Sequence, residues 1–235
     1  ERLNTDFNVA LSENLSDFKA GDKAVIRTHG IPKNELALLR ERKVDVIDAT
    51  CPYVTKPQQI CEEMSAEGYD IVIFGDEAHP EIKGVKSYAT NGAHVVTSVD
   101  ELEKLHLRDK IAVVAQTTRK ADDYLAICNY LIPRHKEVRV FNTICNATFE
   151  NQDAVRELAK EADVMIVIGG KNSSNTKQLQ SIAVSSGTES HHIEGPDDLD
   201  ASWFEGKKLC GISAGASTPD WIIQQVVDTI KMMTK

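Results

Sequence analysis

Short apolar runs alternate with helical patterns along almost the whole chain, and this alternation limits the possible folds more than any other feature. Runs of β-branched and aromatic residues predict strands, and the 3.6-residue periodicity between them predicts helices. The predicted strands are Ala24–Arg27, Val44–Asp48, Asp70–Phe74, His94–Thr97, Lys110–Ala115, Val138–Phe141, Asp163–Ile168, Glu189–Ile193 and Lys208–Ile212. The predicted helices are Lys33–Arg42, Thr55–Glu67, Pro80–Tyr88, Lys120–Leu131, Thr148–Lys160, Ser174–Ser186 and Pro219–Met232.

Strand–helix alternation is typical of parallel sheets flanked by helices. We therefore expect an α/β fold of pseudo-repeated modules, with mostly parallel sheets flanked by helices around a central site. The boundaries fall at two cysteine turns, which gives three parts: 1–50 as the remainder of an N-terminal module, 51–144 as a middle module and 145–235 as a C-terminal module. Two apolar stripes support the helices, namely Leu125, Cys128, Leu131 and Ile132, and Val155, Leu158, Ala159 and Ala162.

The composition is that of an ordinary globular protein, with 235 residues, 41% hydrophobic and 27% charged. A net charge of −9 argues against a nucleic-acid partner, and no apolar run approaches the roughly 20 residues of a membrane span. Five cysteines without disulfide-like spacing favour reduced thiols and a cytoplasmic location. Residues Glu1–Asn4 read as the tail of a helix, so we expect that an N-terminal segment is missing.

Two cysteines occupy matching places in two copies of one local pattern, Val46–Pro52 and Val140–Asn146. In each copy a short apolar run stops at a small polar residue, Cys51 or Cys145 follows, and a helical pattern comes next. A helix N-terminus favours the thiolate, which is the form that binds metal or attacks an electrophile. The duplication predicts two modules that direct their cysteines at one shared centre. The other cysteines lie in apolar patterns and are interpreted as core residues: Cys61, Cys128 and Cys210.

Polar side chains and small residues gather where the predicted strands end, which is where parallel sheets bind ligands. The turn Gly169–Asn175 offers flexible glycines, hydroxyls and free N–H groups at a helix start, and Ser213–Ser217 resembles it physically. We weigh an anion site there about equally against a plain serine N-cap. Two such turns suit a ligand with two phosphates.

His29 and His79 each follow a predicted strand, and could donate to phosphate oxygens or carry protons near neutral pH. A purely structural role is the more common one for a single histidine. Glu81 lies in the first turn of a helix, where the dipole favours a carboxylate in any case, but beside His79 it could relay protons. Thr117 could cap the next helix or bind a substrate hydroxyl. Adjacent strand residues face opposite ways, so the pair His191–His192 is not interpreted as a metal site.

Together these segments resemble the 4-hydroxy-3-methylbut-2-enyl diphosphate reductase family, also called IspH or LytB. The resemblance rests on motifs that occur in the family's order from about residue 20 onward: Thr28-His29-Gly30, Asp48-Ala49-Thr50-Cys51-Pro52 with Val54-Thr55-Lys56, His79-Pro80-Glu81, Gln116-Thr117-Thr118, Ile144-Cys145-Asn146-Ala147-Thr148, Lys171-Asn172-Ser173-Ser174-Asn175 and Ala214-Gly215-Ala216-Ser217.

The resemblance implies three α/β modules around a [4Fe-4S] cluster held by three cysteines, with one iron left for substrate. It implies removal of the allylic hydroxyl of a diphosphate substrate to give isopentenyl and dimethylallyl diphosphate, with electrons from an external donor such as ferredoxin or flavodoxin. Carried over by motif, the cluster ligands are Cys51 and Cys145, the catalytic residues are Glu81 and Thr117, and the diphosphate ligands are His29, His79, Ser173, Ser174, Asn175 and Ser217.

The chain departs from the family pattern in two ways. The Gly-rich motif that carries the family's first cluster cysteine, and a further histidine, are not in this sequence, and Ala78 stands where the family often has glycine. Two cysteines cannot supply three thiolates, which counts against activity of the chain as printed. From the residues alone two other functions stay open: a non-redox α/β module that binds a phosphorylated ligand, and a thiol-dependent transferase that uses Cys51 or Cys145 as nucleophile.

Overall fold

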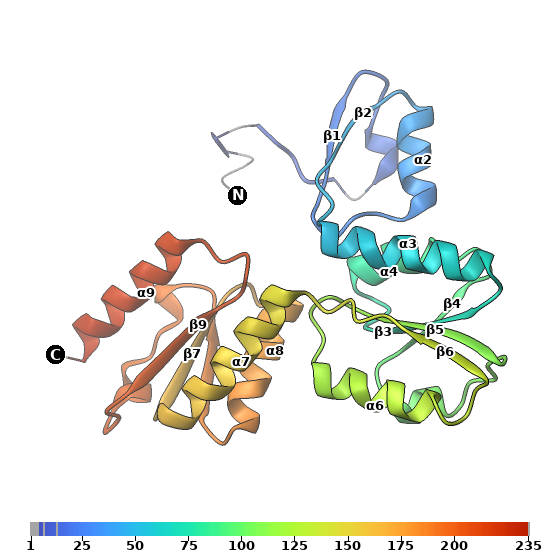
Figure 1. The fold of residues 1–235 in the computed structure, drawn as a ribbon. Helices are drawn as coiled ribbons and strands as arrows, with labels where there is room; N and C mark the ends of the chain where they lie inside the picture. Colours follow the sequence, from blue (N-terminus) through green and yellow to red (C-terminus); the bar gives the residue numbers. More distant parts are fainter. Residues whose placement is uncertain (1–4, 7, 13, 235) are drawn as a thin grey trace. The chain divides into compact units, whose positions relative to one another are not determined.

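The strands form three separate sheets, and every strand pair in them is parallel (Figure 1). The structure is a computed structural model that describes residues 5–234 except 7 and 13. The sheets are β1 (Lys23–Ile26) with β2 (Asp45–Asp48), then the order β4 (Ala93–Val96), β3 (Asp70–Phe74), β5 (Lys110–Ala115), β6 (Glu137–Val140), and the order β8 (Glu189–Ile193), β7 (Val164–Ile168), β9 (Cys210–Ala214). The α/β class with mostly parallel sheets flanked by helices is confirmed.

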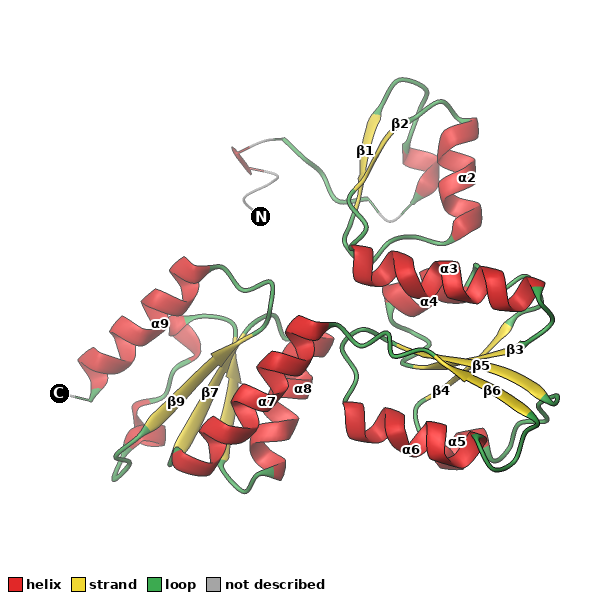
Figure 2. Ribbon diagram, in the orientation of Figure 1, coloured by secondary structure: helices red, strands yellow, loops and turns green. Residues whose placement is uncertain are grey.

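Each predicted helix is present, and α5 is a short addition that the sequence did not indicate (Figure 2). The helices are α2 (Lys33–Glu41), α3 (Pro52–Ala66), α4 (Pro80–Lys86), α5 (Val99–Leu102), α6 (Ala121–Leu131), α7 (Asn146–Glu161), α8 (Ser174–Ser185) and α9 (Asp220–Met233). Short 3₁₀ turns occur at Leu15–Asp17, Pro196–Asp198 and Ala201–Phe204. Among the described residues, no helix combines the length and the apolar character that a bilayer span needs.

Two helices begin earlier than predicted. We expected starts at Thr55 and Thr148, but α3 begins at Pro52 and α7 at Asn146. Proline suits the first position of a helix, because its missing N–H has no intrahelical partner there in any case. Cys51 and Cys145 therefore lie directly at a helix start rather than in a loop ahead of it.

Contacts between Cα atoms divide the chain into two compact units. Unit 1 comprises residues 1–116 with 126–143, and unit 2 comprises residues 117–125 with 144–235. The division into three modules at residues 50 and 144 stays a prediction. The expected helix tail Glu1–Asn4 lies outside the described residues.

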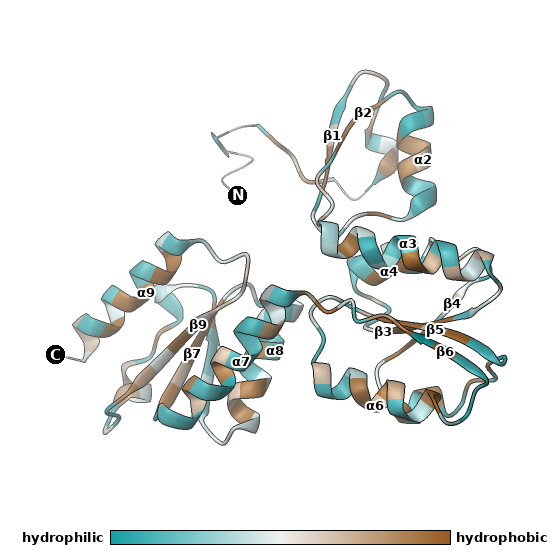
Figure 3. Ribbon diagram, in the orientation of Figure 1, coloured by the Kyte–Doolittle hydropathy of each residue, from teal (hydrophilic) through white to brown (hydrophobic). Residues whose placement is uncertain are grey.

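The central strands β3 and β5 of the four-stranded sheet in unit 1 are buried on both faces. Along β3 the side chains alternate, so that Ile71 and Ile73 pack against α3 and α4 together with Ala112 and Val114 of β5. The adjacent β3 residue Val72 points the other way and is also fully buried. Figure 3 shows β5 as a largely hydrophobic strand, as expected for a strand covered on both faces.

The two-stranded sheet of unit 1 carries helix α2 on one face. Ala24, Ile26 and Leu39 form the centre of that small core. On the opposite face Val25 and Ile47, which are partners in the register, are exposed. This sheet therefore has apolar side chains on both faces, and α2 covers only one of these faces.

The sheet of unit 2 shows the same alternation. Met165 and Val167 of β7 pack against α7 and α8, with Val155 and Ala159 of the predicted stripe in the same cluster. Their neighbours along the strand face the other way, where α9 and the turn Ala201–Phe204 cover them. The stripe predicted for α7 is confirmed, with Leu158 and Ala162 at its partly buried edge.

The stripe predicted for α6 was partly wrong. Cys128 and Leu131 are buried as expected, but Leu125 and Ile132 are 59% and 53% exposed. The buried face also contains Tyr124 and Ile127. The 3.6-residue period fits both sets, and the aromatic ring of Tyr124 buries more area than Leu125 would.

Candidate functional site

Four of the residues singled out from the sequence share one local position, the N-cap that precedes the first turn of a helix. Cys51 has φ −60° and ψ 135°, His79 and Cys145 both have φ −67° and ψ 135°, and Ser173 has φ −71° and ψ 118°. An N-cap side chain lies next to backbone N–H groups that have no partner within the helix. These positions therefore suit anionic ligands and side chains that act on them.

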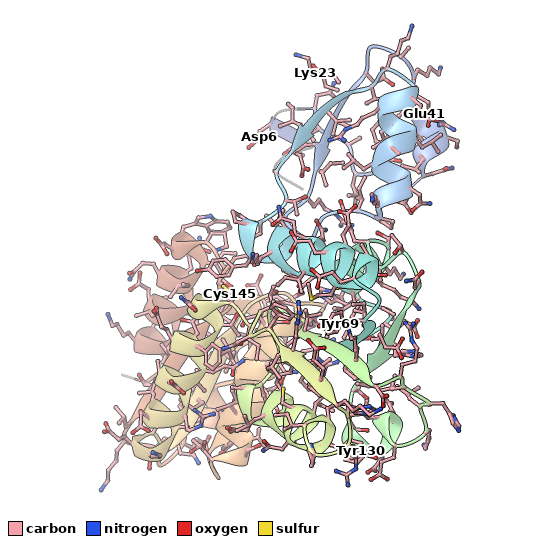
Figure 4. All side chains as sticks on the ribbon, turned by 45° about the vertical axis from the view of Figure 1, so that its right-hand side comes forward. Asp6, Lys23, Glu41, Tyr69, Tyr130 and Cys145 are labelled. Atoms are coloured by element: carbon pink, nitrogen blue, oxygen red, sulfur yellow. The ribbon has the colours of Figure 1, made fainter. Side chains whose placement is uncertain are left out.

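The two cysteine turns have the same hydrogen-bond pattern in the two units. The N–H of Cys51 donates to the carbonyl of Thr28 at 3.0 Å, and the N–H of Cys145 donates to Thr117 at 2.9 Å. Neither thiol makes a capping hydrogen bond, and both are free and half-buried. Cys145 is labelled in Figure 4, where the loop after β6 enters α7. Backbone contacts and the side chains of Asp48 and Thr143 hold these turns, and neither sulfur atom takes part in a capping hydrogen bond.

The remaining cysteines belong to apolar packing, as predicted. Cys61 is fully buried against β3 and β5, and this burial raises its pKa to about 12. Cys128 is 3% exposed. Cys210 is half-buried at the start of β9, and desolvation raises its pKa as well. A thiol with a raised pKa is a poor nucleophile and a poor metal ligand near neutral pH.

In unit 1 the two predicted histidines lie against each other. The rings of His29 and His79 have centroids 5.4 Å apart and planes at 89°. Gly30 makes the turn after His29 possible, since its φ is +72° and a Cβ there would lie 2.9 Å from Nε2 of Gln58. The Nδ1 atom of His79 accepts the N–H of Glu81 at 3.2 Å. In the neutral ring the proton of His79 is therefore on Nε2.

The surroundings of His29 favour its neutral form. Desolvation of the ring, and after it the positive charge of Arg27, lower the pKa of His29 from its ordinary value of 6.5. At pH 7 the ring can thus donate one hydrogen bond and accept another. A neutral donor binds a phosphate oxygen more weakly than an imidazolium would, but it carries no cost of burying a charge.

Glu81 is held in the first turn of α4 with only 1% of its surface exposed. The turn before it is braced by Gln116, whose side-chain oxygen accepts the N–H of Asp76 at 3.0 Å. Asp76 in turn accepts the N–H of Ala78 at 2.9 Å. Gln116 was predicted to lie at a strand end, but no role was predicted for it. Its position before Thr117, at the end of a fully buried strand, was the available signal.

In unit 2 the predicted anion turn is built as a helix cap with one unmatched group. The hydroxyl of Ser173 accepts the N–H of Thr176 at 3.3 Å, and the hydroxyls of Ser174 and Thr118 are 2.9 Å apart. Asn175 is 8% exposed, and neither its Oδ1 nor its Nδ2 has a hydrogen-bond partner in the described part of the chain. A buried amide without a partner is costly, so a polar ligand that satisfied it would be stabilised here.

The second small-residue turn adjoins the first. Gly215 donates its N–H to the carbonyl of Ile168 at 2.8 Å, which ties the end of β9 to the end of β7. A Cβ at Gly215 or at Gly169 would come within 2.5 Å of the hydroxyl of Thr176. Ser217 follows Gly215 by two positions and is exposed. Unit 2 thus brings the Ser173–Asn175 turn and the Ser217 turn together at the ends of neighbouring strands.

The pair His191–His192 faces opposite ways, as predicted. His191 stacks on Trp203 with ring centroids 3.8 Å apart, while Nε2 of His192 lies 2.8 Å from the carbonyl oxygen of Gly169. One histidine therefore packs on a surface aromatic ring, and the other supports the start of the anion turn. The opposite directions of the two rings follow from strand geometry, but the contact between His192 and Gly169 could not be predicted from the sequence.

Several candidate residues lie at strand ends: the two cysteine turns, His29 with His79, and the Ser173–Asn175 turn. Comparison with known proteins shows that they belong to one family. The model of the family described as LytB protein matches residues 2–231. The chain belongs to the LytB family. It is 72% identical over 231 residues to the 4-hydroxy-3-methylbut-2-enyl diphosphate reductase of Sulfurimonas denitrificans, a match covering 98% of this chain and 84% of the relative. The enzyme of the same name from Campylobacter curvus is 63% identical, with the same shares covered.

Solved structures of LytB proteins have the same fold. The E-1-hydroxy-2-methyl-but-2-enyl-4-diphosphate reductase from Plasmodium falciparum matches with a TM-score of 0.88 and 28% identity, over 95% of this chain and 71% of that one. A second structure, described as the terminal enzyme of the non-mevalonate pathway, matches with a TM-score of 0.63 and 42% identity, over 95% and 79%. The α/β architecture inferred from the alternation of strands and helices is thus the architecture of this LytB chain.

Proposed function

We propose that this chain acts as a 4-hydroxy-3-methylbut-2-enyl diphosphate reductase, which removes the allylic hydroxyl of its substrate to give isopentenyl and dimethylallyl diphosphate in the non-mevalonate pathway. The family match over residues 2–231 and the identity of 72% to a reductase of that name support this assignment. The observation in the fold that carries it is the buried, unpartnered amide of Asn175 at a helix start. That is where an anionic diphosphate would be bound.

The proposed ligands of the diphosphate are the residues that the family motifs indicate. In unit 2 the amide of Asn175 and the hydroxyls of Ser173, Ser174 and Ser217 would donate to phosphate oxygens. In unit 1 the rings of His29 and His79 would do the same. Most of these donors are neutral, so the binding relies on many aligned hydrogen bonds and on the dipole of α8 rather than on one strong ion pair.

The proposed cofactor is a [4Fe-4S] cluster with Cys51 and Cys145 as thiolate ligands. Thiolates are the ligands that such clusters prefer, and both sulfur atoms are free of structural hydrogen bonds. The described residues nevertheless contain no group of three His, Cys, Asp or Glu side chains able to hold a metal. These residues alone do not make a complete cluster site, because three thiolates are expected in this family.

Two further residues are proposed to act on the substrate itself. Glu81 would deliver the proton that lets the allylic hydroxyl leave as water, and Thr117 would orient that hydroxyl. The carboxyl of Glu81 is buried, and its backbone is fixed through His79. A proton carrier in this position is shielded from bulk water, which favours directed transfer over exchange with solvent.

The electrons are proposed to come from an external carrier such as ferredoxin or flavodoxin, and the site of action is proposed to be the cytoplasm. The reaction consumes two electrons and two protons: one proton leaves with hydroxide as water, and the other forms the new C–H bond of the product. Reduced thiols are compatible with that compartment, since no cysteine among the described residues forms a disulfide. The net charge of −9 gives no support to a nucleic-acid partner.

Calorimetry with pyrophosphate tests the anion site that carries the proposal. We expect weak but saturable heat with the parent chain and loss of most of that heat in Asn175→Ala. Asn172→Ala is the matched control, because Asn172 lies in the same turn but is exposed, and it should bind like the parent. Equal heats for the parent chain and Asn175→Ala would place the anion elsewhere. Oxidation of a reduced dye coupled to consumption of the allylic diphosphate tests the reaction.

A further inference from the structure

The hydroxyl of Thr176, the residue after Asn175, also lacks a hydrogen-bond partner among the described residues. Thr176 is 1% exposed, and its hydroxyl makes no hydrogen bond within the part of the chain that the structure describes. Its backbone N–H is used, since it donates to Ser173. Two successive residues of the first turn of α8 therefore bury unmatched polar atoms, although buried hydroxyls and amides are nearly always hydrogen-bonded.

The location of the Thr176 hydroxyl connects it to both small-residue turns. The side chains of a helix lean toward its N-terminus, so this hydroxyl points to the end of α8 where the anion turn lies. Cβ atoms added to Gly169 or Gly215 would both lie 2.5 Å from it. The hydroxyl thus lies directly against the backbone of the turns that end β7 and β9.

Thr218, a second threonine at the end of β7, does have a hydrogen bond for its hydroxyl. The hydroxyl of Thr218 donates to the carbonyl of Ile168 at 3.1 Å. The same strand end therefore satisfies one hydroxyl internally and leaves the other unmatched. Valine has nearly the same shape as threonine and no polar atom to satisfy, so folding alone gives no reason for a hydroxyl at position 176.

We propose that Thr176 is a further ligand for the anionic group of the substrate, with its hydroxyl donating a hydrogen bond to a phosphate oxygen beside Asn175. This proposal rests on the proposed diphosphate site and adds a residue to it. The donor lies between the two turns, so an anion held there would contact the ends of both β7 and β9. The hydroxyl hydrogen rotates about the Cβ–Oγ1 bond, so its direction is set by the acceptor that it meets.

Calorimetry of pyrophosphate with the parent chain and with Thr176→Val, together with thermal unfolding of both, tests this role. We expect the melting temperature of Thr176→Val to be equal to or above that of the parent, because a buried unmatched hydroxyl has been removed. We expect its affinity for pyrophosphate to fall about tenfold or more, as for one lost hydrogen bond to a charged group. Thr176→Ser, which keeps the hydroxyl, should bind like the parent.

Two matched variants separate binding from stability. Ser190→Ala removes another buried unmatched hydroxyl of unit 2, at the far end of β8, and should leave the affinity unchanged. Thr218→Val removes a satisfied hydroxyl and should lower the melting temperature. If the parent binds pyrophosphate and Thr176→Val binds equally well, the role of Thr176 is overturned and the diphosphate site stands. If the parent itself gives no heat, both proposals fall.

Discussion

Adding a methyl group at Gly215 should destabilise unit 2 through one identifiable contact. The new Cβ would lie 2.5 Å from the Thr176 hydroxyl and 3.4 Å from that of Thr218. Ordinary contacts of a Cβ begin near 3.4 Å, so the shortfall is confined to Thr176. The backbone of Gly169 lies close on its other side, since a Cβ built there would also be 2.5 Å from the hydroxyl, so the hydroxyl has little room to move that way. Overpacking of this kind costs about 1–3 kcal/mol.

The tryptophans make the effect measurable in one unit. Both tryptophans of the chain, Trp203 and Trp221, belong to unit 2. Tryptophan fluorescence during urea unfolding therefore reports on that unit, and Gly215→Ala should lower the midpoint by on the order of 1 M. Gly195→Ala is the control: Gly195 has φ −167°, which any residue adopts, and nothing lies within 4 Å of an added Cβ. Its midpoint should match the parent.

A second substitution shows whether the contact between the new Cβ and the Thr176 hydroxyl causes the loss of stability. Thr176→Ala removes the hydroxyl and should restore much of the stability of Gly215→Ala, with a coupling of about 1 kcal/mol or more between the two sites. Thr176→Ser keeps the hydroxyl and should not restore it. An unchanged midpoint for Gly215→Ala would refute the reasoning. So would equal recovery with alanine and serine at position 176.

Three further predictions concern unit 1 and the cysteines. Glu81→Gln should lower turnover by roughly 100-fold while diphosphate binding stays largely intact; unchanged steady-state rates with a reducing dye would leave Glu81 as a helix-start carboxylate only. Ellman's reagent should modify Cys51 and Cys145 in the native chain, whereas Cys61, with its pKa raised to about 12, should react only after unfolding; early labelling of Cys61, found by peptide mapping, would contradict this. Because the pKa of His29 is lower in the folded chain than its ordinary 6.5, the unfolded chain takes up that proton first, so the contribution of His29 to the stability of unit 1 should be constant above pH 6.5 and fall as the pH drops below it. His29→Gln should reduce this loss in urea titrations followed by circular dichroism, and an identical acid limb in both proteins would argue against it.

The fold was readable from the sequence because the buried parallel strands are continuous apolar runs. β3 and β5 were predicted with the bounds that the structure has, and so was the largely polar edge strand β8. The failures lie where periodicity is ambiguous or too short to see. α5 spans only Val99–Leu102, and the face of α6 was misassigned because Tyr124 and Leu125 fit the same period.

The site was partly readable because functional side chains follow the carboxyl ends of parallel strands. That rule led to His29, His79 and the Ser173–Asn175 turn before any geometry was available. It could not reveal unmatched hydrogen bonds, which depend on every neighbour at once. The brace of Gln116 on Asp76 and the orphaned hydroxyl of Thr176 both belong to this class.

The N-cap placement of the cysteines separates what the chain needs for folding from what it needs for chemistry. Replacing Ser173 removes a side-chain cap, which typically costs about 0.5–2 kcal/mol of stability. Replacing Cys51 or Cys145 removes no such bond, because neither thiol makes a capping hydrogen bond. Selection on stability therefore acts weakly on the two thiols, and a chain of this kind could lose its redox chemistry by single substitutions while still folding. Persistence of both thiols in a lineage would then record selection for the chemistry itself.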